Sequence, residues 1–164
     1  MGRISEDNPR YRTKDDMAKD VAFILKADVA YGTKYAVIND VCWVWTGFTG
    51  KYLGCPYWSK MAVMQHRLNP KARLKHEHVV PRKVVVNMLF TLDQVTPGRV
   101  RGILDMFLIG AVVTPEEDAV LSTNYRAEMP EEFHDPAHPS YHEPWLRYMR
   151  CGIEVIRQLP TSGS

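Results

Sequence analysis

The sequence contains no apolar run long enough to cross a lipid bilayer. Its longest apolar stretch, from Ile103 to Val113, is interrupted by Asp105, whereas a membrane-spanning helix needs roughly 18 or more consecutive apolar residues. The N-terminal residues are polar and carry none of the apolar core of a secretion signal. We therefore expect a cytoplasmic protein that does not associate with membranes.

Cysteine is scarce, and common catalytic motifs are missing. The three cysteines, at positions 42, 55 and 151, include no pair with the CxxC spacing of a zinc ribbon, and their odd number favours reduced thiols. The sequence also lacks a P-loop, a GxGxxG turn and a GxSxG nucleophile motif. These absences argue against several familiar classes of nucleotide-binding enzyme and hydrolase, and we expect no cofactor.

The composition and the apolar spacing indicate one helical domain. A chain of 164 residues, of which 45% are hydrophobic, can form a core of its own. The clearest amphipathic helix pattern runs from Val100 to Leu108. Such patterns predict a mainly α, compact single domain of six to seven helices with at most a small β element. We expect it to span residues 13–159, between a flexible N-terminal arm (1–12) and a flexible tail (160–164).

Two local patterns make more specific predictions about individual elements. Pro56 suits the first position of a helix, and apolar residues then repeat at helical spacing: Tyr57, Met61, Met64 and Leu68. The residues "AVV", 111 to 113, favour a short strand or extended segment.

Charge is distributed unevenly along the chain. Residues 60–83 contain seven basic residues and one acidic residue, whereas residues 115–143 contain eight acidic residues and one basic residue. The two segments either pack near each other or form solvated faces, or the basic segment meets phosphate groups or an acidic protein.

Aromatic residues cluster around a glycine-rich loop: Trp43, Trp45, Tyr52, Tyr57 and Trp58. If buried, they belong to the core. If exposed, they suit a protein interface or stacking on bases.

The stretch "KHEHVVPRK", residues 75–83, carries the side chains best suited to chemistry. Pro81 biases the residues before it toward extended backbone. On an extended segment His76 and His78 point to the same face and could share a metal ion, whereas Glu77 points to the opposite face. The alternative is structural, with both histidines satisfied by local hydrogen bonds and His76 holding the loop against the core.

The residues "EHVVP" resemble the core of the HNH (His-Me finger) endonucleases, and "CWVWTG", residues 42 to 47, resembles an element of phage proteins of that kind. The resemblance implies that Glu77 or His76 binds Mg²⁺ or another divalent metal ion and that His78 activates water for attack on a phosphodiester. The second metal-binding histidine of that family has no counterpart before His134.

Several longer segments resemble a family of small uncharacterised proteins carried by phages and prophages: "YWSKMAVM", "LKHEHVVPRKVV", "AVVTPEEDAVL" and "EPWLRYMRCGI". Proteins of this kind often act by binding host machinery, including defence complexes, so the resemblance implies a partner in the host cell.

Two functions follow from these observations. The first is an accessory protein that inhibits a host defence or nucleic-acid-handling complex, by binding a host protein or protein–nucleic acid complex, with DNA or RNA as further candidates. Its expected contacts form a basic surface: Arg73, Lys75, His76, Arg82 and Lys83. The alternative is a degenerate HNH-type endonuclease in which Glu77 and His78 are catalytic and a divalent metal ion binds at His76 and Glu77.

Overall fold

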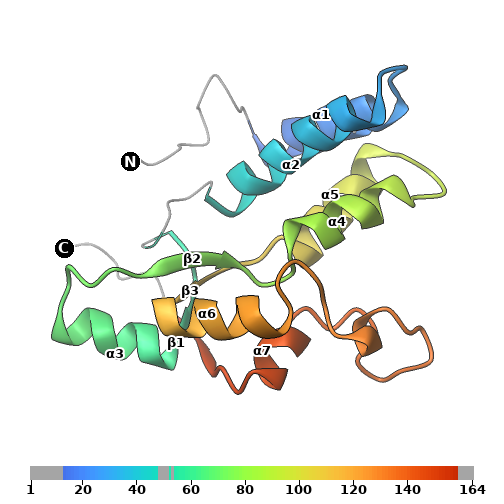
Figure 1. Ribbon diagram of the computed structural model, residues 1–164. Coiled ribbons are helices and arrows are strands. Elements are labelled where there is room, and N and C mark those ends of the chain that lie inside the picture. Colours follow the sequence, from blue (N-terminus) through green and yellow to red (C-terminus); the bar gives the residue numbers. More distant parts are fainter. Residues whose placement is uncertain (1–12, 48–51, 53, 159–164) are drawn as a thin grey trace.

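The computed structural model describes residues 13–47, 52 and 54–158, which form two lobes (Figure 1). The helical lobe contains four helices: α1 (Lys14–Lys26), α2 (Tyr31–Gly47), α4 (Arg82–Phe90) and α5 (Pro97–Phe107). The sheet lobe contains four strands: β1 (Tyr57–Ser59), β2 (Lys75–His78), β3 (Gly110–Val113) and β4 (Val155–Arg157). Three further helices accompany the sheet: α3 (Lys60–Leu68), α6 (Pro115–Asn124) and α7 (Leu146–Arg150). A 3-10 turn, η1 (Glu131–Phe133), lies between α6 and α7.

The prediction of a mainly α protein is confirmed by the seven helices in the described residues. The sheet is larger than the small β element that we predicted. Its strand order is β2-β3-β1-β4, with β1 parallel to β3 and both edge strands antiparallel to their neighbours. Strands of three or four residues are too short to give a clear alternating pattern, which is why the sequence understates the sheet. The predicted arm and tail lie outside the described residues.

The segment after Pro56 differs from its prediction. Tyr57 belongs to strand β1, which pairs with β3 and β4, and α3 begins only at Lys60. Ser59 caps α3 by accepting a hydrogen bond from the backbone N–H of Ala62. The buried residues of α3 are Ala62 and Val63, whereas the predicted apolar face is exposed: Met61, Met64 and Leu68. Pairing on both sides of β1 therefore outweighs the helix-start signal of Pro56.

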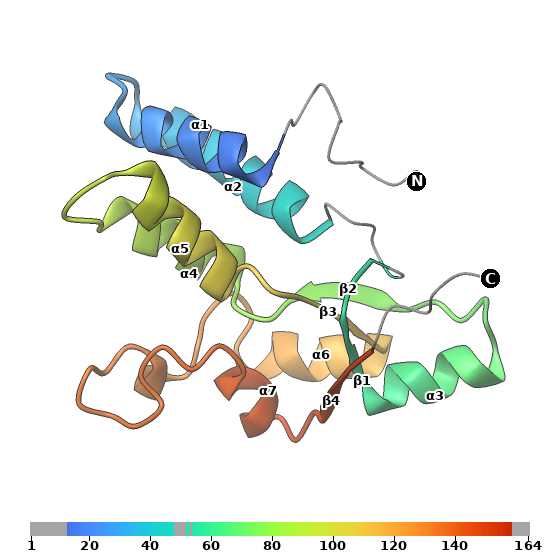
Figure 2. The same ribbon diagram turned by 180° about the vertical axis from the view of Figure 1, so that it is seen from behind.

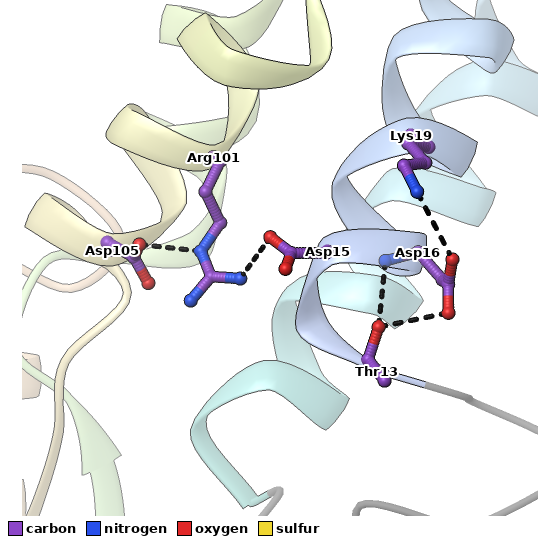
Figure 3. Close-up of polar contacts among 6 residues, drawn as sticks. All are labelled: Thr13, Asp15, Asp16, Lys19, Arg101 and Asp105. Carbon is purple, nitrogen blue, oxygen red and sulfur yellow. Dashed lines mark hydrogen bonds and ion pairs between the residues drawn. The ribbon is translucent and has the colours of Figure 1, made fainter.

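Polar contacts join α1 to α5 at the surface of the helical lobe (Figure 3). Thr13 caps α1 by accepting from the backbone N–H of Asp16 at 3.2 Å. On α5, Arg101 donates through Nη1 to Asp15 at 2.8 Å and through Nε to Asp105 at 2.6 Å. Exposed ion pairs of this kind contribute about 0 to 1 kcal/mol each, so they orient the two helices more than they stabilise the lobe.

Apolar burial holds the helical lobe together. Each of its four helices contributes a side chain with no solvent exposure: Val21, Ile38, Leu89 and Leu104. Burying one such side chain is worth about 1.5 to 3 kcal/mol. Phe133 of η1 is also fully buried against this core, and both views show the segment between α6 and α7 folding back beneath the lobe (Figure 2). No helix in the described part of the chain is long and apolar enough to cross a membrane.

Strand β2 lies at the junction of the two lobes, between the end of α2 and helix α6 (Figures 1 and 2). Among the described strands it pairs with β3 alone, at one edge of the sheet, with His76 opposite Val112 and His78 opposite Gly110. A Cβ atom added at Gly110 would collide with the His76 ring, so a glycine is needed there for the ring to lie over β3. The "KHEH" stretch therefore lies at the junction of the two lobes, where residues of both can contact it.

Candidate functional site

His76 and His78 lie side by side on the face of β2 that meets α2. Their ring centroids are 5.7 Å apart. Both rings approach Trp43 of α2, at centroid distances of 6.4 Å for His76 and 5.5 Å for His78. The extended backbone expected before Pro81 is observed, and the two histidines share a face for that reason.

The end of α2 supplies the polar partner of His78. Thr46 Oγ1 lies 2.9 Å from His78 Nε2, and the backbone of Cys42 forms a further hydrogen bond with the ring. The segments "CWVWTG" and "EHVVP", more than thirty residues apart in the sequence, therefore meet in space.

Burial makes His78 a neutral side chain. Only 7% of the residue is exposed, and this desolvation, with the nearby positive charges of His76 and Arg82, lowers its pKa from 6.5 to about 3. The ring is therefore unprotonated at pH 7. It is available as a hydrogen-bonding group but lies almost out of reach of solvent.

Glu77 points to the opposite face of β2, toward α7. Its Oε1 accepts from Arg147 Nη2 at 2.5 Å and its Oε2 accepts from the Tyr148 hydroxyl at 2.7 Å. Burial raises the pKa of Glu77, and the charge of Arg147 and the hydrogen bonds from Tyr148 and Arg147 act against that rise. Both carboxylate oxygens are thus already engaged within the protein.

Arg147 is the central residue of this second face, and it was not among the residues predicted from the sequence. Only 1% of it is exposed. Besides Glu77, Arg147 Nη2 donates to the His78 carbonyl at 2.7 Å, and Nη1 donates to the Arg126 carbonyl at 3.3 Å. Its one signal in the sequence is an arginine next to a tyrosine in the otherwise apolar run "WLRYM", which does not reveal a partner some seventy residues away.

The structure does not bring the predicted metal ligands together. His76 faces α2, whereas Glu77 faces Arg147 on the other side of the strand. No group of three or more histidine, cysteine, aspartate or glutamate residues suited to a metal ion occurs in the described ranges. His78 and Glu77, the predicted catalytic pair, likewise project from opposite faces of β2.

The charged residues of the predicted basic surface fall into two groups, one at each end of β2. Arg73 and Lys75 are exposed where the strand begins. Arg82 and Lys83 follow its end, where the Arg82 guanidinium lies 5.0 Å from the centroid of the Trp43 ring and Lys83 pairs with Glu128. That last pair also shows that part of the basic segment lies beside part of the acidic one.

No family model, curated protein or solved structure matches the chain.

The buried pair of Arg147 and Glu77 generates a stability prediction. Arg147→Met leaves Glu77 buried without its cation, and we expect it to lower the free energy of unfolding by about 3 to 5 kcal/mol. Urea unfolding at pH 7 measures this loss. Glu77→Gln in the same chain removes the unpaired charge while keeping an acceptor for Tyr148, so the double variant should recover a large part of the loss.

Arg150→Met is the matched control, because Arg150 lies on the same helix but pairs with Glu132 at the surface. We expect this control to cost less than about 1 kcal/mol. Equal losses for the two arginine variants would contradict the role given to Arg147.

The depressed pKa of His78 predicts a dependence of stability on pH. Above pH 6.5 the ring is neutral in both states, whereas below it only the unfolded chain takes up the proton until the pH approaches 3. The contribution of His78 to the free energy of unfolding is therefore fully present above pH 6.5. It is lost on acidification, by up to about 1.4 kcal/mol per pH unit. In urea unfolding between about pH 7 and pH 5, His78→Gln should show a shallower loss of stability than the wild type. Parallel pH profiles would contradict the prediction.

Proposed function

We propose that this protein binds a macromolecular partner through the surface formed by Trp43, Arg82, Lys83 and His76, which we term the Trp43–Arg82 face. The single observation that carries the proposal is the exposed Trp43 side chain, 44% accessible, with the Arg82 guanidinium 5.0 Å from the centroid of its ring. Tryptophan and arginine are enriched among the residues that dominate binding energies. Pre-ordering them against each other reduces the entropy lost on association.

The surroundings of the face support a partner with negative charge. Lys83 is exposed beside Arg82, and Arg73 adds positive charge near the far end of β2. Lys75, by contrast, projects from the opposite face of the strand, as Glu77 does. The Lys83–Glu128 pair is also exposed and therefore weak, so Lys83 can exchange Glu128 for a group on a partner. This charge favours fast, salt-dependent association with an anionic surface.

The proposed setting is a phage or another mobile element, in which the protein inhibits a host defence or nucleic-acid-handling complex. The resemblance of several segments to small phage and prophage proteins supports that setting. The partner would then be a host protein or a protein–nucleic acid complex.

A degenerate HNH-type endonuclease is the second candidate. It is favoured by one observation, the contact of the "CWVWTG" and "EHVVP" segments, which places neutral His78 beside Thr46. In this proposal His78 would activate water, and a divalent metal ion would stabilise the negative charge on the phosphate and the leaving oxygen. Glu77 would have to release Arg147 and Tyr148 to bind that ion, which is why we rank the binding function first.

Charge reversal on the Trp43–Arg82 face tests the binding function. We expect each single variant, Arg82→Glu or Lys83→Glu, to weaken capture of a host protein or nucleoprotein complex by roughly tenfold or more. Capture by either variant should also depend less steeply on salt concentration. The measurement is quantitative pull-down from a host-cell lysate by immobilised protein at several salt concentrations, with the captured complex identified.

Arg99→Glu provides the control, since it makes the same charge change at an exposed site near the start of α5. If Arg99→Glu weakens capture as much as the two reversals do, overall charge rather than this face is responsible and the proposal fails.

The nuclease candidate is tested by incubating plasmid and single-stranded DNA with the protein in Mg²⁺, Mn²⁺ and Ni²⁺ in turn. We expect no cleavage, because the two oxygens of Glu77 are held by Arg147 and Tyr148. Metal-dependent cleavage that is lost in His78→Ala, in a variant shown to remain folded, would instead establish the nuclease.

A further inference from the structure

A cavity of about 410 Å³ opens beside the Trp43–Arg82 face. It lies between α2, the end of β2, the start of α4 and the turn after α6, and its polar lining comes mainly from Asn39, Glu77, His78, Arg82, Lys83 and Arg126. Its volume falls within the range of small-molecule binding sites, roughly 300 to 1,000 Å³. Arg82 belongs to both features, because it lines the cavity and its guanidinium lies over the Trp43 ring.

The cavity carries an excess of positive charge. Its one acidic lining residue, Glu77, is neutralised by Arg147, which approaches it from the protein interior. His78 is neutral at pH 7 because burial depresses its pKa. The remaining charged groups of the lining are the cations of Arg82, Lys83 and Arg126.

These three cations are available to a ligand to different degrees. Within the described part of the chain, the Arg126 guanidinium makes no hydrogen bond or ion pair, and the residue is exposed. Lys83 has only its exposed contact with Glu128 at the rim. Arg82 donates through Nη1 to the Asn39 carbonyl at 3.5 Å, and its other guanidinium N–H groups make no hydrogen bond to any residue that the structure describes, so they can donate to an oxyanion.

The start of α4 adds to the positive potential. Pro81 precedes the helix without a side-chain cap, and no acidic residue lies in the first turn. The partial positive charge of a helix N-terminus then faces the same side as Arg82 and Lys83. Placing two cations at this end is unfavourable in the absence of an anion.

We infer that this cavity binds a phosphate group of a single-stranded nucleic acid, with an unpaired base stacking on the Arg82–Trp43 pair at its rim. The inference rests on the proposed function and names its partner class. Arginine recognises phosphate through paired hydrogen bonds, and unpaired bases stack on aromatic rings and guanidinium planes. A purely acidic peptide would use the cations but has no ring to place on the Arg82–Trp43 pair, which is why nucleic acid is favoured over a carboxylate ligand.

The test uses the full chain with fluorescein-labelled 12-nucleotide single-stranded DNA and RNA, an abasic DNA of the same length, and a poly-glutamate peptide of matched charge. Fluorescence anisotropy gives the affinities at several salt concentrations. We expect both oligonucleotides to bind more tightly than the abasic strand, and the peptide to bind most weakly. The DNA and RNA arms show which sugar is preferred.

Two variants address the cavity and the stack separately. Arg126→Gln removes one phosphate contact, so affinity for the oligonucleotides should fall roughly tenfold, and the slope of log K against log salt should decrease by about 0.7. Trp43→Leu should weaken binding of the oligonucleotides but not of the abasic strand. Arg99→Gln, with the same loss of charge on α5, should bind nearly as the wild type does.

The inference is overturned if none of the strands binds, if Arg126→Gln and Arg99→Gln behave alike, or if poly-glutamate or the abasic strand binds as tightly as the oligonucleotides. Each of these results leaves the proposed function standing if capture of a host complex still depends on Arg82. Loss of that dependence together with tight oligonucleotide binding would instead overturn the host-complex function and keep the nucleic-acid site.

Discussion

The ion pair between Arg147 and Glu77 is the constraint on which the arrangement of the site depends. Removing two charges from water is costly, and the cost is offset only where the remaining donors and acceptors find partners. Here the Tyr148 hydroxyl, the His78 carbonyl and the Arg126 carbonyl supply most of those partners, and of the pair's own polar atoms only Arg147 Nε is left without one among the described residues. The pair therefore joins α7, β2 and the turn after α6 at one point.

The same pair fixes which face of β2 each side chain occupies. Side chains alternate along a strand, so a slip of one residue would move every side chain to the other face. Such a slip would turn Glu77 toward α2 and carry His76 and His78 toward Arg147. Because a buried arginine without its carboxylate is strongly unfavourable, the ion pair holds the histidines against Trp43 and Thr46, and so sets the composition of the Trp43–Arg82 face.

Local features of the site were predictable from the sequence, and distant ones were not. The extended backbone before Pro81 and the opposite faces of His76 and Glu77 follow from residues within the stretch itself. Arg147 could not be found in this way, because its partner lies some seventy residues earlier and no local pattern links the two. The exposure of Met61 on α3 was missed for a related reason: apolar spacing indicates a helical face but not which face the rest of the protein covers.

The long separation of the pair also bears on how the chain reaches its native state. The helices α1 and α2 are neighbours in sequence and in space, and α5, which also packs on α1, completes the four helices of the helical lobe by residue 107. Glu77, by contrast, leaves the ribosome some seventy residues before Arg147, and β1 must wait for β4, near residue 156, to complete its pairing. Until then Glu77 lacks the Arg147 cation that offsets the cost of burying its carboxylate. We therefore expect β2 to remain unpacked against the rest of the sheet lobe while the helices pack. The sheet lobe is thus the late-forming part of the molecule during synthesis.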